Sequence, residues 1–194
     1  MITVREKYEE LTEVNRSKFI AYIIPYASFA GYQKQLKESN PKANHVVYAY
    51  RYLNEFDQMV EGSSDDGEPK GCAGVPALNV LRGKEMVNVA VLIVRYFGGI
   101  KLGTGGMARA YALAVKNLLA RAVLIPYEKQ IEYLFETSYS DIDRTLHQLK
   151  EIGITQYERD FGIDGVKWVI VGSEESILKF KPDGDVNKYI MQYL

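Results

Sequence analysis

The sequence predicts an α+β protein of two domains, residues 1–126 and 127–194. Three observations support this. The chain has 194 residues, 47% of them apolar and 25% charged, a composition typical of globular proteins with a packed core. Strand and helix patterns alternate as far as Ala122 around a nearly continuous apolar strand at residues 88–97. A second strand, helix, strand and strand pattern begins after Lys129.

Short runs of β-branched and aromatic residues predict the strands of the first domain. These runs are residues 17–25, 45–53 and 88–97, and a further short strand begins at residues 58–60. The run at residues 88–97 is apolar enough for a strand that is buried on both faces of a sheet. We therefore expect it at the centre of the sheet.

Capping and breaking residues indicate the helices of the first domain. Ser28 begins a helix that ends before Pro41, because the residue before a proline avoids the helical region. Pro76 suits the first position of a second helix. Ala, Leu and Val without Gly or Pro predict a third. The expected helices are residues 29–39, 75–81 and 107–122.

The second domain has a different pattern. An amphipathic helix at residues 141–152, closed by Gly153, follows the first of its strands. The expected strands are residues 130–137, 154–161 and 166–172. This order is half of a ferredoxin-like unit. A further helix is expected from Glu174, and the pattern of the last twenty residues favours no type of element.

The net charge of −1 hides an uneven distribution. Residues 1–126 carry 16 Lys and Arg against 12 Asp and Glu, a net charge of +4. Residues 127–194 carry 8 against 13, a net charge of −5. The span from Arg82 to Arg121 is more uneven still, with Glu85 as its single acid. A basic domain attracts anionic partners that the whole-chain balance does not predict.

The glycine-rich turn at residues 98–106 is a candidate anion or nucleic-acid site. A strand that leads through such a turn into a helix presents unpaired backbone N–H groups and the positive end of the helix dipole. The alternative is that the nearby charges only solvate the surface. Because the spacing matches neither a Walker A loop nor a dinucleotide fingerprint, we expect no nucleotide cofactor. The candidate residues are Arg95, Lys101, Gly103, Gly105, Gly106 and Arg109.

The loop at residues 61–74 holds a second candidate site, Asp65, Asp66, Glu68 and Lys70. Three carboxylates within four residues can hold a hard cation or supply an acid and a base. Asp-Gly and Glu-Pro are equally ordinary turn sequences, so a structural role is the alternative. The spacing differs from an EF-hand loop, and the single cysteine, Cys72, cannot build a disulfide or a zinc site alone. We expect no bound metal.

Tyrosine is frequent, at 15 of 194 residues. Tyr48, Tyr50 and Tyr52 recur at every second position, so on a strand they share one face. Beside His45 and Arg51, such a face is a candidate for stacking unpaired bases. The alternative is a row of amphipathic rings that is covered by helices.

These segments together closely resemble the IMPACT/YigZ family. The resemblance covers residues 17–122, and the rest resembles the small C-terminal domain of the bacterial members. Lys70 and Cys72 stand where relatives commonly have Ser and Thr. The matching motifs are Asn44-His45 with Tyr48-Ala49-Tyr50-Arg51, Asp65-Asp66-Gly67-Glu68-Pro69, and Arg95-Tyr96-Phe97-Gly98-Gly99-Ile100-Lys101-Leu102-Gly103-Thr104-Gly105-Gly106 with Arg109-Ala110-Tyr111.

The resemblance implies a fold and a role. The implied fold is an N-terminal two-layer α/β sandwich with a βαβ unit of ribosomal-protein and elongation-factor type, followed by a ferredoxin-like domain similar to those of elongation factor G. Both kinds of domain contact RNA. The eukaryotic relatives regulate translation initiation in the amino-acid starvation response, through an additional N-terminal domain.

We therefore expect a non-catalytic cytoplasmic protein that binds RNA or the ribosome and regulates translation. One alternative is an enzyme for a small phosphorylated or anionic substrate, with the basic residues at the glycine-rich turn holding the anion and the loop carboxylates as acid and base. Another is a protein-interaction module in a stress response. The N-terminus lacks a signal-peptide core, and no apolar run approaches the ~20 residues that span a membrane, so no membrane partner is expected.

Overall fold

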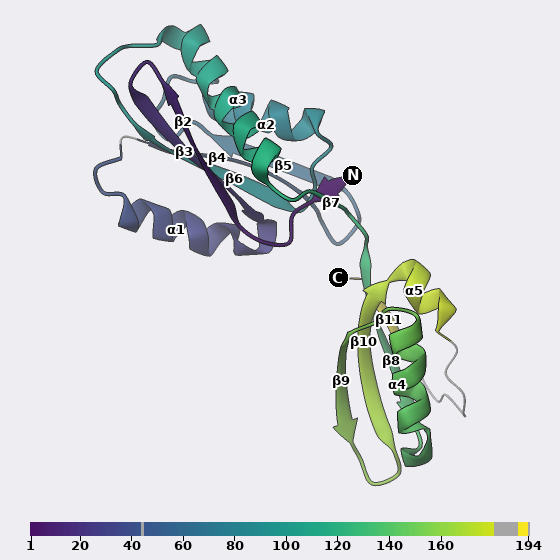
Figure 1. Ribbon diagram of the computed structural model, residues 1–194. Coiled ribbons are helices and arrows are strands. Elements are labelled where there is room, and N and C mark those ends of the chain that lie inside the picture. Colours follow the sequence, from purple (N-terminus) through teal and green to yellow (C-terminus); the bar gives the residue numbers. More distant parts are fainter. Residues whose placement is uncertain (44, 181–189, 194) are drawn as a thin grey trace. The chain divides into compact units, whose positions relative to one another are not determined.

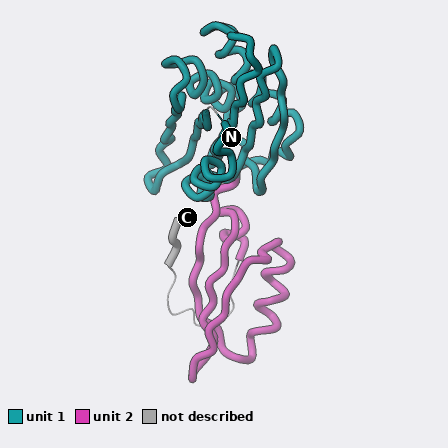
Figure 2. The backbone as a smooth tube through the Cα atoms, turned by 90° about the vertical axis from the view of Figure 1, so that its left-hand side faces the viewer, with its two compact units in different colours: residues 1–127 teal, residues 128–194 magenta. Residues whose placement is uncertain are grey.

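The computed structural model describes every residue except 44, 181–189 and 194. It consists of two compact units, Met1–Tyr127 (unit 1) and Glu128–Leu194 (unit 2), which are coloured separately in Figure 2. Each unit has its own sheet and its own hydrophobic core. The mixed α and β class expected from the sequence is confirmed. Among the helices described, none is both long and apolar enough to cross a membrane.

Unit 1 is built on a five-stranded antiparallel sheet in the order β2-β3-β6-β4-β5. Its strands are β2 (Tyr8–Val14), β3 (Ser17–Pro25), β4 (His45–Leu53), β5 (Met59–Ser64) and β6 (Val89–Tyr96). β3 and β4 have the predicted bounds, and β6 lies buried at the centre as its apolar sequence indicates. β2 has no clear signal in the sequence because it is an edge strand with three glutamates among its seven residues. A short pair, β1 (Ile2–Thr3) with β7 (Ile125–Pro126), joins the two ends of the unit.

Helices cover both faces of this sheet (Figure 1). α1 (Phe29–Ser39) packs on one face, and α2 (Gly74–Gly83) and α3 (Gly103–Arg121) pack on the other. β3 and β4 each pair antiparallel with β6, so they run parallel to one another and form the expected βαβ unit with α1. The sheet therefore carries a helix layer on each face, one more than the two-layer arrangement that the resemblance implies.

Two of these helices begin earlier than the sequence predicts. α3 starts at Gly103 instead of residue 107, and α2 starts at Gly74, so that Pro76 is its third residue. Glycine and proline fit a first turn because its N–H groups have no partner within the helix. Ser28 precedes α1, as predicted, but its side chain makes no capping hydrogen bond because a short 3₁₀ turn, η1 (Tyr26–Ser28), leads into the helix.

Unit 2 is ferredoxin-like, as predicted. Its antiparallel sheet has the order β11-β8-β10-β9, which places the last strand beside the first. Leu149 of α4 and Ile177 of α5 pack with Phe135 and Trp168 in its core. β11 falls in the tail whose type the sequence left undecided. The elements are β8 (Gln130–Thr137), η2 (Tyr139–Asp141), α4 (Ile142–Glu151), β9 (Gln156–Phe161), β10 (Val166–Ser173), α5 (Glu174–Lys179) and β11 (Ile190–Tyr193).

Candidate functional site

A row of three side chains crosses the centre of the unit 1 sheet at the end of β6. Arg95 lies directly opposite Phe19 of β3 and His45 of β4 in the strand register. Side chains directly opposite in antiparallel strands point to the same face. That face is the one covered by α2 and α3, since Phe19 packs in their core and its ring meets the Tyr111 ring of α3 edge-on at 5.1 Å.

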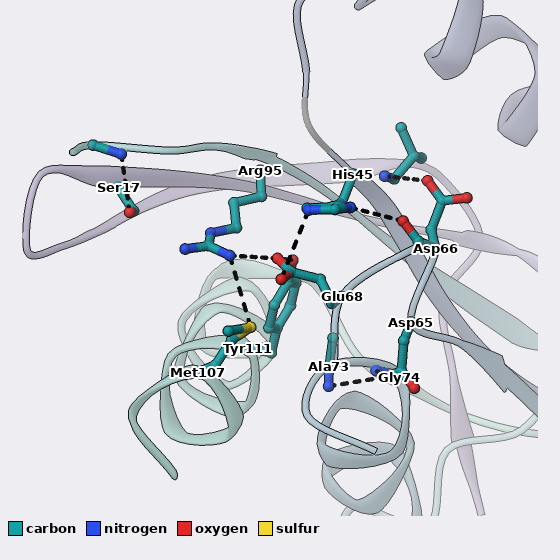
Figure 3. Close-up of polar contacts among 12 residues, drawn as sticks. Ser17, His45, Asp65, Asp66, Glu68, Ala73, Gly74, Arg95, Met107 and Tyr111 are labelled. Atoms are coloured by element: carbon teal, nitrogen blue, oxygen red, sulfur yellow. Dashed lines mark hydrogen bonds and ion pairs between the residues drawn. The ribbon is translucent and has the colours of Figure 1, made fainter. Parts of the chain in front are cut away.

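Glu68, from the loop between β5 and α2, reaches into this row and joins it to α3 (Figure 3). Its Oε1 accepts hydrogen bonds from Arg95 Nη1 at 2.5 Å and from the Tyr111 hydroxyl at 2.8 Å. Its Oε2 lies 3.7 Å from His45 Nε2. The Glu68 and Arg95 side chains are only 3% and 7% exposed. We call Glu68, Arg95, Tyr111 and His45 the Glu68 cluster.

The contacts around the Glu68 cluster identify a hydrogen-bond donor on each of two members. Burial, followed by the nearby Glu68 charge, raises the pKa of the Tyr111 hydroxyl far above its usual value, so the hydroxyl stays protonated and donates. His45 Nδ1 lies 2.7 Å from the carbonyl oxygen of Asp66, and since a carbonyl only accepts, Nδ1 is the donor. Arg95 Nη1 also contacts the Met107 sulfur, while Arg95 Nε has no hydrogen-bond partner among the described residues.

Asp65 caps the start of α2. Its Oδ1 accepts from the backbone N–H groups of Ala73 and Gly74 at 3.0 and 2.8 Å, and its Oδ2 accepts from Gly71 at 2.7 Å. Burial by itself raises the pKa of Asp65, but these three donors outweigh it and hold the pKa below its usual value. Asp65 therefore fixes the fold of the loop and is ionised at neutral pH.

Asp66 fastens the same loop to β4 and α1. Its Oδ2 accepts from the Val46 backbone N–H at 2.8 Å, and its Oδ1 lies 2.7 Å from Lys37 Nζ. Burial raises the pKa of Asp66, while Lys37 and the Val46 N–H lower it, and the lowering prevails. Asp65, Asp66 and Glu68 point in three directions in Figure 3, and each is held by different partners.

The three carboxylates of the predicted acidic site therefore do not form one site, because each makes its own structural contacts. No group of three His, Cys, Asp or Glu residues suited to a metal ion occurs in the described part of the chain. Lys70 is exposed and contributes to none of the contacts drawn in Figure 3. The structural alternative for this loop is thus the one that its geometry supports, with Glu68 as the member that links it to β6 and α3.

The glycine-rich turn needs glycine for two different reasons. Gly98 lies so close to the β2–β3 turn that a Cβ would fall 2.0 Å from the carbonyl carbon of Arg16. Its N–H donates to the buried Ser17 hydroxyl at 3.1 Å. Gly99 and Gly103 instead have φ angles of +86° and +67°, which glycine adopts without strain. Gly105 and Gly106 lie in the first turn of α3, where no side chain caps the helix and no acidic residue lies.

The structure separates the basic residues of the span from Lys84 to Arg121 into two groups. Arg95 is paired inside the protein, so it does not present its charge to an external anion as the sequence interpretation supposed. Arg121 is paired with Glu10 at 3.1 Å. Among the described residues, no carboxylate lies within 4.0 Å of the exposed cations that remain, which are Lys84, Lys101, Arg109 and Lys116.

Two exposed apolar side chains and a small hollow lie beside the turn and offer contact to a ligand. Phe97 and Ile100 are 48% and 43% exposed. A hollow of about 230 Å³ lies where Arg109 and Leu113 of α3 approach the β2–β3 turn. The turn therefore combines exposed cations and a helix N-terminus with an exposed aromatic ring.

The tyrosine stripe of β4 is not part of this site. Tyr48 and Tyr50 pack with α1 on the opposite face of the sheet, and the Tyr52 ring stacks on Tyr26 at 4.0 Å. His45 points to the other face because side chains alternate along a strand. The structure thus separates His45 from the tyrosines, and it supports the alternative in which these rings line a covered face.

Tyr111 and Met107 are the members of the site that sequence reasoning did not select. Both lie on the buried side of α3, four residues apart, and resemble ordinary core residues. A tyrosine hydroxyl within an otherwise apolar helix face was the available signal, because a buried hydroxyl requires a hydrogen-bond partner.

Comparisons with known proteins agree with this architecture. Residues 15–119 match the family described as Impact N-terminal domain. An IMPACT family member of Thermus thermophilus is 34% identical over 81% of this chain and 84% of that protein. The IMPACT family member YigZ of Escherichia coli is 32% identical over 67% and 65%. The Protein IMPACT of Oryctolagus cuniculus is 32% identical over 53% and 37%. A crystal structure described as a hypothetical protein has a TM-score of 0.63 at 25% identity, over 88% and 84%.

Proposed function

The chain belongs to the IMPACT family, and from that premise we propose that it is a non-catalytic protein that regulates translation by binding RNA or the ribosome. The translational role is the one that the family resemblance implies. The mode of binding rests on unit 1, in which exposed cations lie in the glycine-rich turn and along α3.

The observation that carries the proposal is the unbalanced positive charge of this surface. The chain has no carboxylate between Glu85 and Glu128. Lys101 in the turn and Arg109 in α3 are exposed, and neither has a described carboxylate within 4.0 Å. Lys and Arg side chains, backbone N–H groups and helix N-termini are the groups that contact phosphates in nucleic-acid complexes. All three occur together at the start of α3.

Two further features favour RNA over a small anion. Phe97 is 48% exposed at the start of the same turn that carries Lys101, and an exposed ring suits stacking with an unpaired base. The loop carboxylates that an enzyme would need are held by backbone N–H groups, Lys37 and Arg95. The geometry thus offers a binding surface more readily than an acid and base pair.

Filter binding to single-stranded and hairpin RNA at several salt concentrations tests the proposal. We expect Lys101→Ala and Arg109→Ala each to weaken binding several-fold on every RNA sequence, and to reduce the slope of log K against log salt by about 1 for each lost phosphate contact. Phe97→Ala is expected to weaken binding to the single-stranded RNA more than to the hairpin.

Lys34→Ala is the matched control, since Lys34 is an exposed cation of α1 on the opposite face of the sheet. It should leave RNA affinity unchanged. Absence of RNA binding at low salt would overturn the proposal. If phosphorylated metabolites raise the melting temperature and RNA does not, the enzyme alternative is favoured instead.

A further inference from the structure

A groove of about 790 Å³ lies between α2 and α3 of unit 1. Its apolar lining includes Val80 of α2, Ala112 and Leu119 of α3, and Leu124. Small residues of α3 leave this space open, because alanine projects only a methyl group between the two helices. The groove is separate from the Glu68 cluster, whose one member on α3, Tyr111, packs against the sheet.

The charged residues that line this groove are all basic. Lys84 follows the end of α2, and Arg109 and Lys116 lie two helical turns apart on α3. No Asp or Glu belongs to the lining. No carboxylate of the described residues approaches these three cations within 4.0 Å. The groove is thus an apolar surface with an uncompensated basic rim.

The chemistry of the lining favours a polypeptide over a nucleic acid. No Phe, Tyr or Trp lines the groove, so it lacks the rings on which unpaired bases stack. An apolar channel between two helices is instead the surface that receives the apolar face of a third helix. The lining follows α3 from Ala108 to Ala120, which at 1.5 Å per residue is roughly 18 Å, or about twelve residues of a docked helix.

We propose that the α2–α3 groove docks an amphipathic helix of an acidic partner protein. The apolar side of that helix rests on Val80, Ala112 and Leu119, and acidic side chains along its edges meet Lys84, Arg109 and Lys116. Arg109 and Lys116 are seven residues apart, so acids spaced by two turns on the partner helix face both. The proposal does not depend on RNA binding at the glycine-rich turn.

Fluorescence anisotropy with synthetic peptides tests the proposal on the full chain. The probe is a labelled 14-residue helical peptide with leucines on one face and glutamates on both edges. We expect it to bind, and to bind more weakly as salt increases. A peptide with lysines replacing the glutamates, and a peptide of scrambled order, should bind at least tenfold more weakly.

Charge-reversed variants locate the binding. The double variant Lys84→Glu with Lys116→Glu should bind the acidic peptide at least tenfold more weakly. Ala120→Glu should have the same effect because it places a carboxylate in the groove. All three positions are exposed, so folding is expected to be unaffected. Lys34→Glu with Lys42→Glu, which makes the same change in charge away from the groove, is the matched control and should bind as the unchanged chain does.

This experiment distinguishes failure of the docking proposal from failure of the RNA-binding proposal. Lys101→Glu should weaken RNA binding and leave peptide binding unchanged. Equal binding of the acidic, basic and scrambled peptides would overturn the docking proposal. So would a loss of RNA affinity in the Lys84 and Lys116 variant as large as that of Lys101→Glu, because the groove would then belong to the nucleic-acid surface.

Discussion

Replacing Glu68 with leucine should destabilise unit 1 by about 3–5 kcal/mol. The change keeps the volume of the side chain but removes the carboxylate that neutralises Arg95, whose side chain is 7% exposed. Removing one partner of a buried ion pair costs about that much because the remaining charge stays buried and unpaired. Arg95 Nε already has no partner among the described residues, so no neighbouring group replaces Glu68.

Urea unfolding can assign this loss to unit 1. The single tryptophan, Trp168, is 1% exposed in the core of unit 2, so its fluorescence reports the unfolding of that unit alone. Circular dichroism reports both units. We expect Glu68→Leu to shift only the transition that tryptophan fluorescence does not detect. In a thermal scan, the loss corresponds to a decrease of roughly 12–20 °C in the melting temperature of unit 1.

A double-mutant cycle separates the ion pair from the volume change. Arg95→Met removes the charge and keeps a long apolar side chain, so the double variant should be more stable than Glu68→Leu alone. Tyr111→Phe removes one donor to Glu68 and should cost about 1.5–3 kcal/mol, as is usual for a hydrogen bond to a charged group. If Glu68→Leu costs under about 1 kcal/mol, or if the two single costs simply add, the account of the Glu68 cluster is wrong.

Three further predictions follow from the geometry of unit 1. Gly98→Ala, whose Cβ would fall 2.0 Å from a backbone carbon, should destabilise by about 1–3 kcal/mol or more in urea. Gly31→Ala is the control and should cost less, because an added Cβ there meets nothing within 4 Å and Gly31 has no positive φ. The folded pKa of Asp65 is below the unfolded value of 3.8, so its ionised carboxylate stabilises the fold above that pH. This stability is lost as the pH falls through the folded pKa. Asp65→Asn should therefore reduce the difference in unfolding free energy between pH 6 and pH 3. Burial raises the pKa of Tyr22 and Tyr26 to about 12, so these rings should ionise after the exposed tyrosines in an absorbance titration, and Tyr22→Phe should remove part of that late phase; a single phase near pH 10 would contradict this.

Most elements of the fold could be predicted because their signals are local. The bounds of β3, β4 and β8 follow from β-branched and aromatic runs, and the length of α1 follows from Pro41. β2 could not be found in this way, since it is an edge strand in which three of seven residues are glutamate, a residue that is depleted in strands. The sequence pattern places the starts of α2 and α3 too late because glycine and proline resemble helix boundaries, although a first turn accepts both.

The candidate site was predicted less well than the fold. Sequence reasoning selected Arg95 and Glu68 but placed them in two separate candidate sites, the glycine-rich turn and the acidic loop. They are 27 positions apart and neutralise each other. Whether a charged residue faces solvent or a buried partner depends on distant pairing, so no local pattern distinguishes Arg95 from Lys101.

The sequence by itself determined the α+β class, the ferredoxin-like second unit, the family and the cancellation of a basic by an acidic half. These follow from local periodicity, composition and motif. Only the tertiary structure decided which charges remain free. The strand register places Arg95 beside His45, and the loop before α2 places the Glu68 carboxylate next to both. Lys101, Arg109 and Lys116 remain exposed. A charge acts on a partner only if nothing within the fold already neutralises it, and that depends on contacts between residues far apart in the chain.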